Sequence, residues 1–239
     1  MESIRETVAC LAVCGVLLGC SGDSRAAVHT GAARAPLAAD PATKTPAAPA
    51  GSAVTRRTVL FLGTSLTAGL GLDPDSAYPQ QVQQKIDARG LPYQTVNAGV
   101  SGETSAGLLR RLDWVLQAPA AVIVVETGAN DGLRGQSVSA TRTTIGQVLT
   151  RIAQERPEAR VVLVQMEAPT NLGTEYTRAF HAMFPALAKE HGVVLMPFLL
   201  AGVAGLPALN QGDGVHPNLD GERIVVENVW RTVGPLLAP

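Results

Sequence analysis

Residues 59–69 read Val-Leu-Phe-Leu-Gly-Thr-Ser-Leu-Thr-Ala-Gly, a short apolar run followed by a polar turn between two glycines. Four apolar residues, most of them branched, end at Gly63, and Ser65 follows two positions later. The pattern predicts a buried strand that ends in a tight turn, with Ser65 at the carboxyl end of the strand. In open α/β sheets that end of the strands is where ligands bind. Taken alone, the stretch also fits an ordinary polar turn between a strand and a helix.

Strand-like and helix-like patterns alternate from Arg57 onward. Short apolar runs predict five strands, at residues 58–62, 93–98, 121–126, 160–165 and 193–196. Apolar residues at helical spacing predict five helices, at residues 78–89, 104–116, 138–156, 175–191 and 219–236. This alternation predicts an α/β fold, a three-layer α/β/α sandwich. Its parallel five-stranded sheet is expected to be flavodoxin-like, with strand order 2-1-3-4-5.

The same helical spacing predicts which side chains face the sheet. The expected inward-facing positions are Ile86, Leu108, Leu112, Ile145, Leu149 and Ile152. The two tryptophans, Trp114 and Trp230, are expected to be core aromatics.

Composition and charge exclude several classes of protein. The chain has 239 residues, of which 46% are hydrophobic and 16% charged, and these values suit one globular domain plus a tail. Its formal net charge of -1 gives no electrostatic footprint for nucleic acid. The three cysteines, Cys10, Cys14 and Cys20, all lie in the first twenty residues. Disulfides, cysteine metal sites and a cysteine nucleophile are therefore excluded from the domain itself.

The N-terminus has the pattern of a secretory signal peptide, with Arg5 ahead of an apolar run at residues 8–19. The run ends in Leu-Leu-Gly followed by Cys20, which resembles the bacterial lipobox. That resemblance implies removal of residues 1–19 and a lipid anchor on Cys20. With Ser21 next, the rule for enteric bacteria implies an outer membrane protein that faces the periplasm. An ordinary signal peptide is the alternative.

Residues 20–56 are rich in Ala, Pro, Thr and Gly and hold almost no large apolar side chain. Such a segment cannot bury enough surface to offset its ordering entropy, so we expect a disordered tether. The domain is expected to occupy residues 57–239.

Polar, glycine-marked turns follow the first three predicted strands, at residues 63–65, 97–104 and 128–132. A fourth polar loop, at residues 212–218, precedes the last helix. Because the carboxyl ends of parallel strands share one edge of a sheet, the three turns after the strands are expected to gather there.

These turns contain every part that acyl transfer at a serine requires. Ser65 is the candidate nucleophile, His216 the base that takes its proton, and Asp213 the carboxylate that orients the base. Pro217 disfavours helical geometry at His216 and so predicts that the base lies in a loop. The candidate oxyanion hole consists of the Ser65 N–H, the Gly99 N–H and the Asn130 side-chain amide. We reason that a glycine at position 99 lets the backbone approach the substrate closely.

The four blocks, in this order, resemble the SGNH (GDSL) hydrolase superfamily, and most closely its bacterial thioesterase I/lysophospholipase L1 and arylesterase group. The resemblance places the family's catalytic serine, aspartate and histidine on Ser65, Asp213 and His216, and its oxyanion glycine and asparagine on Gly99 and Asn130. It implies a serine esterase for aryl and acyl esters, thioesters or lysophospholipids that works without a metal or organic cofactor. A carbohydrate O-deacetylase, built from the same apparatus, is the alternative enzyme.

The chain departs from the family at one position, where Thr64 replaces the usual aspartate. A threonine hydroxyl bonds to nearby backbone but brings no charge. A non-catalytic binding lipoprotein with a decayed site therefore stays open as a further alternative. Glu126 ends a predicted strand, and either a local backbone contact or a supporting role beside the oxyanion turn would explain it. Asp131 is either a turn residue or a group that supports the site.

Overall fold

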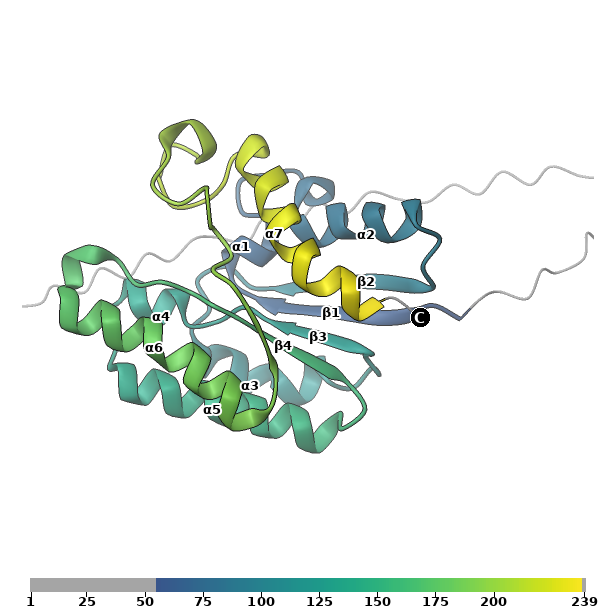
Figure 1. The fold of residues 1–239 in the computed structure, drawn as a ribbon, viewed down its shortest axis with the longest axis horizontal. Helices are drawn as coiled ribbons and strands as arrows, with labels where there is room; N and C mark the ends of the chain where they lie inside the picture. Colours follow the sequence, from purple (N-terminus) through teal and green to yellow (C-terminus); the bar gives the residue numbers. More distant parts are fainter. Residues whose placement is uncertain (1–54, 238–239) are drawn as a thin grey trace, which may run out of the picture. The chain divides into compact units, whose positions relative to one another are not determined.

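The centre of the protein is a five-stranded sheet, seen in a computed structural model that describes residues 55–237 (Figure 1). All strand pairs are parallel, in the order β2-β1-β3-β4-β5, which confirms the predicted topology. The strands are β1 (Arg57–Gly63), β2 (Tyr93–Gly99), β3 (Val122–Val125), β4 (Arg160–Val164) and β5 (Val194–Met196). Every strand end lies within one residue of its prediction. The predicted signal peptide, and the tether up to residue 54, lie outside the described residues.

Helices cover both faces of the sheet. Figure 1 shows α2 and α7 together on one face, and α3, α5 and α6 on the other. These helices are α2 (Tyr78–Ala88), α3 (Ser105–Val115), α5 (Val138–Glu155), α6 (Thr174–His191) and α7 (Leu219–Leu237). The shorter helical segments are α1 (Ser65–Ala68), α4 (Ala129–Leu133), η1 (Pro74–Ser76), η2 (Thr170–Leu172) and η3 (Pro207–Leu209). The three-layer prediction is confirmed, whereas the short segments carry too few residues to show a helical period.

The core lies between the sheet and each helical layer. All four residues of β3 are buried, because a central parallel strand is covered on both faces. The six positions predicted to face inward are all buried as well. The prediction for Trp114 is wrong, since this side chain is 69% exposed. It lies two positions after the buried Leu112 on α3, about 200° around the helix, and so points away from the sheet.

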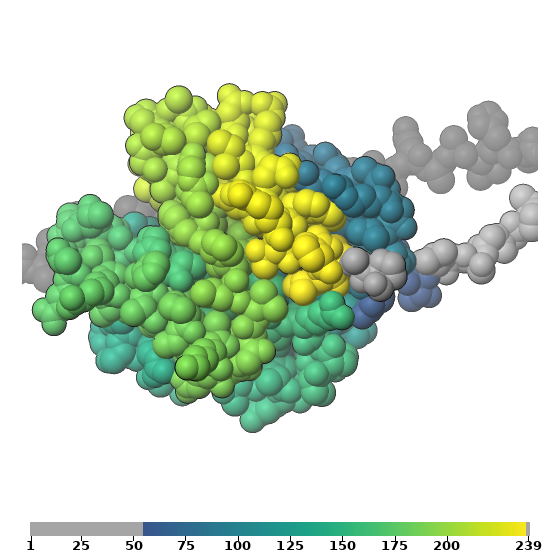
Figure 2. All heavy atoms as spheres, viewed as in Figure 1, coloured from purple at the N-terminus to yellow at the C-terminus, as the bar shows by residue number. Residues whose placement is uncertain are grey.

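Helices α2 and α7 pack side by side, and Figure 2 shows them as one continuous surface. Arg89 and Lys85 lie over the ring of the partly buried Trp230, with the Arg89 guanidinium carbon 4.6 Å from the ring centre. Beneath this surface, the buried Glu222 accepts a hydrogen bond from the Tyr78 N–H at 2.7 Å. Tyr78 is the first residue of α2, so Glu222 satisfies one of the free N–H groups at the start of that helix.

Stability is expected to fall with rising pH because of Glu222. Burial raises the pKa of this carboxyl to about 7, and the Tyr78 N–H offsets only part of the effect. The folded state therefore holds this proton more tightly than the unfolded state, whose carboxyl titrates near its ordinary value. The stabilisation is complete at pH values below that ordinary value and is lost as the pH rises through about 7, and it amounts to about 3 kcal/mol.

Urea unfolding of the wild type and Glu222→Gln at pH 5 and pH 8 measures this contribution. We expect the free energy of unfolding of the wild type to fall, relative to that of Glu222→Gln, by roughly 2 to 3 kcal/mol between the two pH values, because pH 5 already lies above the ordinary pKa of the carboxyl. An equal pH dependence in both proteins would contradict the prediction.

The order of the strands also fixes where a site is to be found. The chain moves outward from β1 to β2 and then returns to β3 on the other side of β1. This reversal leaves a crevice at the carboxyl ends of β1 and β3, where open α/β folds bind ligands. Helix α1 follows β1 directly and α4 follows β3, so both short helices lie at this edge (Figure 1).

Candidate active site

Ser65, His216 and Asp213 form a continuous hydrogen-bonded chain. The distance from Ser65 Oγ to His216 Nε2 is 2.8 Å, and that from His216 Nδ1 to Asp213 Oδ2 is 2.6 Å. The serine is the first residue of α1, whereas the other two residues come from the loop before α7, about 150 positions later. The structure therefore brings together the three residues that the sequence nominated, in the relation of nucleophile, base and orienting carboxylate.

Asp213 is held in its ionised form by three donors. Its Oδ1 accepts the backbone N–H groups of His216 at 3.0 Å and Val215 at 2.9 Å, and its Oδ2 faces the imidazole. The two backbone bonds and then the imidazole lower the pKa of this carboxyl to about 2. Asp213 consequently remains a carboxylate at neutral pH and favours the tautomer with hydrogen on His216 Nδ1. Nε2 is then free to accept a proton from Ser65.

The loop that carries His216 is fixed to the rest of the domain by Gln211, a residue that the sequence analysis missed. The Gln211 N–H donates to the His216 carbonyl at 2.7 Å. The Gln211 side-chain amide donates to the carbonyls of Leu70, just after α1, and Pro217. The Gln211 side chain thus connects the loop that carries His216 to the segment that follows α1. No motif marked this residue, because its role depends on a contact between distant parts of the chain.

Asn130 lies on α4, at the same edge of the sheet as Ser65. Its Nδ2 donates to the Glu103 carbonyl at 3.0 Å, which fixes the orientation of the amide. A side-chain amide has two N–H donors, so one remains available to a ligand. The Ser65 N–H also has no acceptor within its helix, because Ser65 is the first residue of α1.

Gly99 does not match the prediction made for it. Its N–H donates to Asn97 Oδ1 at 2.9 Å, so this group is already engaged. A Cβ at this position would lie 2.8 Å from the Thr67 carbonyl carbon and 2.9 Å from Ala68 Cα. The glycine is therefore explained by the close approach of α1 to the end of β2, and an approach to substrate is not needed to explain it. This geometry conflicts with Gly99 as an oxyanion donor.

Comparison with known proteins identifies the family to which the chain belongs. Its sequence matches the GDSL-like Lipase/Acylhydrolase family over residues 61–224. The chain belongs to this family of hydrolases. It is 37% identical to Esterase TesA of Pseudomonas aeruginosa over 182 residues, which cover 76% of this chain and 90% of that protein. It is 36% identical to Thioesterase 1/protease 1/lysophospholipase L1 of Escherichia coli over 181 residues, which cover 75% and 85% of the two chains.

Solved structures agree with this assignment. The crystal structure of the esterase EstA from Pseudoalteromonas sp., in a form inhibited by monoethylphosphonate, matches with a TM-score of 0.72 at 32% identity. The match covers 76% of this chain and 98% of that one. The protein is a carboxylic ester hydrolase of the GDSL/SGNH type, as the sequence predicted.

Two buried acidic residues support the active edge of this GDSL hydrolase. Asp131 accepts the Ser105 N–H at 2.8 Å and the Ser105 hydroxyl at 2.6 Å, and so joins α4 to the start of α3. Between the two predicted roles, this contact identifies Asp131 as a group that supports the site through its neighbours. Glu126 contacts Thr64 and Thr67 around the nucleophile, which goes beyond the local backbone contact considered from the sequence.

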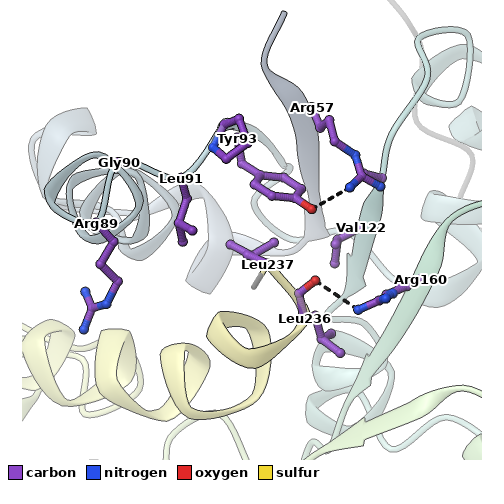
Figure 3. Close-up of a pocket in the computed structure, with 11 residues that line it drawn as sticks. Arg57, Arg89, Gly90, Leu91, Tyr93, Val122, Arg160, Leu236 and Leu237 are labelled. Carbon is purple, nitrogen blue, oxygen red and sulfur yellow. Dashed lines mark hydrogen bonds between the residues drawn. The ribbon is translucent and has the colours of Figure 1, made fainter. Parts of the chain in front are cut away.

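A surface hollow of about 550 Å³ lies at the opposite edge of the hydrolase, at the amino ends of the strands (Figure 3). Its arginines already have partners within the protein. Arg57 donates to the Tyr93 hydroxyl, Arg160 to the Leu236 carbonyl, and Arg89 lies over the Trp230 ring. This hollow contains none of the residues of the GDSL active site.

Within residues 55–237, no three His, Cys, Asp or Glu side chains are grouped in a way that suits a metal ion. No helix in the same range combines the length and the apolar character needed to cross a membrane.

Proposed function

We propose that this hydrolase cleaves esters through an acyl-enzyme on Ser65. The observation that carries the proposal is the unbroken chain from Ser65 Oγ through His216 to Asp213, with links of 2.8 and 2.6 Å. His216 takes the serine proton as Oγ attacks the ester carbonyl, and then gives this proton to the departing alcohol. Asp213 stabilises the imidazolium. Water, deprotonated by the same imidazole, releases the acid and restores Ser65.

The oxyanion of the tetrahedral intermediate is held by the Ser65 N–H, the Asn130 amide and one further backbone donor. Gly102 suits the third role better than Gly99. No hydrogen bond joins the Gly102 N–H to another of the described residues, and the adjoining Glu103 carbonyl is the acceptor of the Asn130 amide. Arg134 donates to the Gly102 carbonyl at 2.9 Å and steadies this turn.

The substrate is an ester, or a thioester or lysophospholipid, with an acyl chain longer than acetyl. The relatives named as an esterase and as a thioesterase and lysophospholipase are consistent with this class. Exposed apolar side chains also occur on the segments that carry the site, namely Leu70 after α1, Leu133 at the end of α4 and Val215 beside the histidine. An acyl chain would cover part of this apolar surface.

A series of p-nitrophenyl esters from acetate to octanoate tests the substrate class. We expect kcat/KM to rise at least tenfold from acetate to hexanoate, because each buried methylene contributes about 0.8 kcal/mol. Steady-state rates of the full chain at one pH and ionic strength provide the values. Acetate as the best substrate would contradict this class and favour the carbohydrate O-deacetylase alternative.

The hydrolase is anchored to the outer membrane of a bacterium through lipid on Cys20 and faces the periplasm. This part rests on the lipobox-like residues 17–20 and on Ser21, all outside the described part of the chain.

Cys20→Ala is expected to abolish incorporation of labelled fatty acid and to move the protein from the membrane fraction to the soluble fraction. Expression of both forms in a Gram-negative host, followed by fractionation, gives the comparison. Cys14→Ala is the matched control and should stay labelled. A wild-type protein without label would refute the anchor.

A further inference from the structure

Glu126 has a fully buried carboxyl group that contacts residues 64–67, the turn that carries the nucleophile Ser65. It follows β3, and none of its surface is exposed to solvent. Its Oε2 accepts the Thr64 N–H at 2.7 Å and the Thr67 hydroxyl at 3.0 Å. The Thr64 hydroxyl lies 2.9 and 3.0 Å from its two carboxylate oxygens. All three donors come from Thr64, directly before Ser65, and Thr67, two positions after it.

Glu126 depends on these donors because no cation within residues 55–237 pairs with its carboxyl group. Among the ion pairs of the described residues, none includes Glu126. Burial raises the pKa of its carboxyl, whereas the bonds from Thr64 and Thr67 lower it. The Tyr78 hydroxyl lies 2.7 Å from the Thr67 hydroxyl and donates to it, because Thr67 uses its own proton for Glu126. The hydrogen bonds from Thr64 and Thr67 therefore offset part of the free-energy cost of burying this carboxyl group.

The fold by itself gives no reason for a carboxylate at this position. The four preceding residues, β3 itself, are valine or isoleucine, and another apolar residue would extend the core without the cost of burying a charge. An apolar residue would, however, leave the Thr64 N–H without its acceptor. The carboxylate thus serves the turn that carries the nucleophile.

Helix α1 depends on this support because it has only four residues. A helix of one turn is not stable by itself in water. Its N-cap residue, Thr64, makes no side-chain capping bond, since its hydroxyl faces Glu126 instead. The chain is also closely packed here: a Cβ at Gly63 would collide with the Thr67 hydroxyl and lie 2.8 Å from Glu126 Oε2. Glu126 consequently holds α1 at both its N-cap and its third residue.

We propose that Glu126 is a positioning residue, whose carboxyl group fixes Thr64 and Thr67 so that Ser65 stays aligned with His216 and with the oxyanion. The inference rests on the proposed function of Ser65. It also gives a reason why Thr64 is compatible with activity where the family usually has aspartate. The threonine hydroxyl lies within hydrogen-bonding distance of both Glu126 carboxyl oxygens and needs no charge of its own to make this contact.

Glu126→Gln tests this role directly. Glutamine keeps the size of the side chain but replaces one acceptor by an N–H₂ group, which opposes the Thr64 and Thr67 donors. We expect kcat for p-nitrophenyl butyrate to fall on the order of a hundredfold, with KM within about twofold of the wild type.

Val125→Ala is the matched control, because it alters the buried residue directly before Glu126, at the end of β3. It should lower the melting temperature and leave kcat unchanged at 25 °C. A kcat for Glu126→Gln within twofold of the wild type, or an equal loss of kcat in Val125→Ala, would overturn the proposal.

A second pair of variants keeps Glu126 in place and so remains informative if Glu126→Gln does not fold. Thr64→Val removes the hydroxyl donor and is expected to lower kcat about tenfold, the equivalent of one lost hydrogen bond. Thr64→Ser retains the donor and should recover most of the wild-type kcat. Equal kcat in the two variants would overturn the proposal.

Measurements on the wild type distinguish a failure of the positioning role from a failure of the proposed function. A wild type that neither hydrolyses the ester nor reacts with a fluorophosphonate would refute the acyl-enzyme and the positioning role together. An active wild type with an equally active Glu126→Gln would refute the positioning role alone.

Discussion

Ser65→Ala is expected to lower kcat/KM for p-nitrophenyl butyrate by roughly 10⁴- to 10⁶-fold. The alanine leaves His216 and Asp213 in place but removes the atom that attacks the ester. Any residual hydrolysis would then come from direct attack by water, assisted by the oxyanion donors alone. Steady-state rates at saturating and limiting ester measure the loss in kcat and in kcat/KM.

The matched control for this substitution is Ser139→Ala, which removes an exposed hydroxyl on α5. It should leave kcat/KM within about twofold of the wild type. Both variants should unfold at temperatures close to that of the wild type, because neither removes buried apolar surface. A Ser65→Ala enzyme that keeps more than a tenth of the activity would exclude Ser65 as the nucleophile.

Asn130→Ala is expected to cost on the order of 10²- to 10³-fold in kcat, with little change in KM. The amide donates to charge that develops on the ester oxygen in the transition state, so its loss affects turnover more than binding. The same ester and the same steady-state assay give both constants. A variant with intact turnover would rule out the oxyanion role of Asn130.

Asn130→Asp separates this effect from a change of size. Aspartate has nearly the shape of asparagine but places a negative charge against the oxyanion, so its kcat should be at least as low as that of the alanine variant. Because Asn130 also bonds to the Glu103 carbonyl, thermal unfolding of both variants is needed to measure any loss of stability. A fully active Asn130→Asp would contradict electrostatic stabilisation at this position.

The sequence predicted the sheet and the long helices because their signals are local. Buried parallel strands read as apolar runs, and long helices repeat their apolar residues with a helical period. Trp114 shows where this reasoning fails, since an aromatic residue near the end of α3 was assigned to the core by its type and not by its angle around the helix. Helices α1 and α4 have four and five residues, which is too few for a period to appear.

The triad was also predictable, for two different reasons. Ser65 lies in a turn whose place follows from the order of the strands, whereas Asp213 and His216 were found by their residue types and by the resemblance of their loop to the GDSL family pattern. Gly99 was a different case. A glycine can mark a close approach to a ligand or to another backbone, and only coordinates reveal that α1 occupies the space beside it. Glu126 and Gln211 act through contacts between segments far apart in the chain, and no local pattern distinguishes such residues from ordinary polar ones.

Catalysis through an ester of Ser65 leaves an acyl-enzyme that can be trapped during turnover. The full chain would be mixed with p-nitrophenyl butyrate, quenched in acid during turnover, digested and mapped by mass spectrometry. We expect one butyryl group per chain, located on Ser65. Turnover with no acyl group on Ser65, or with the group on another residue, would contradict this expectation.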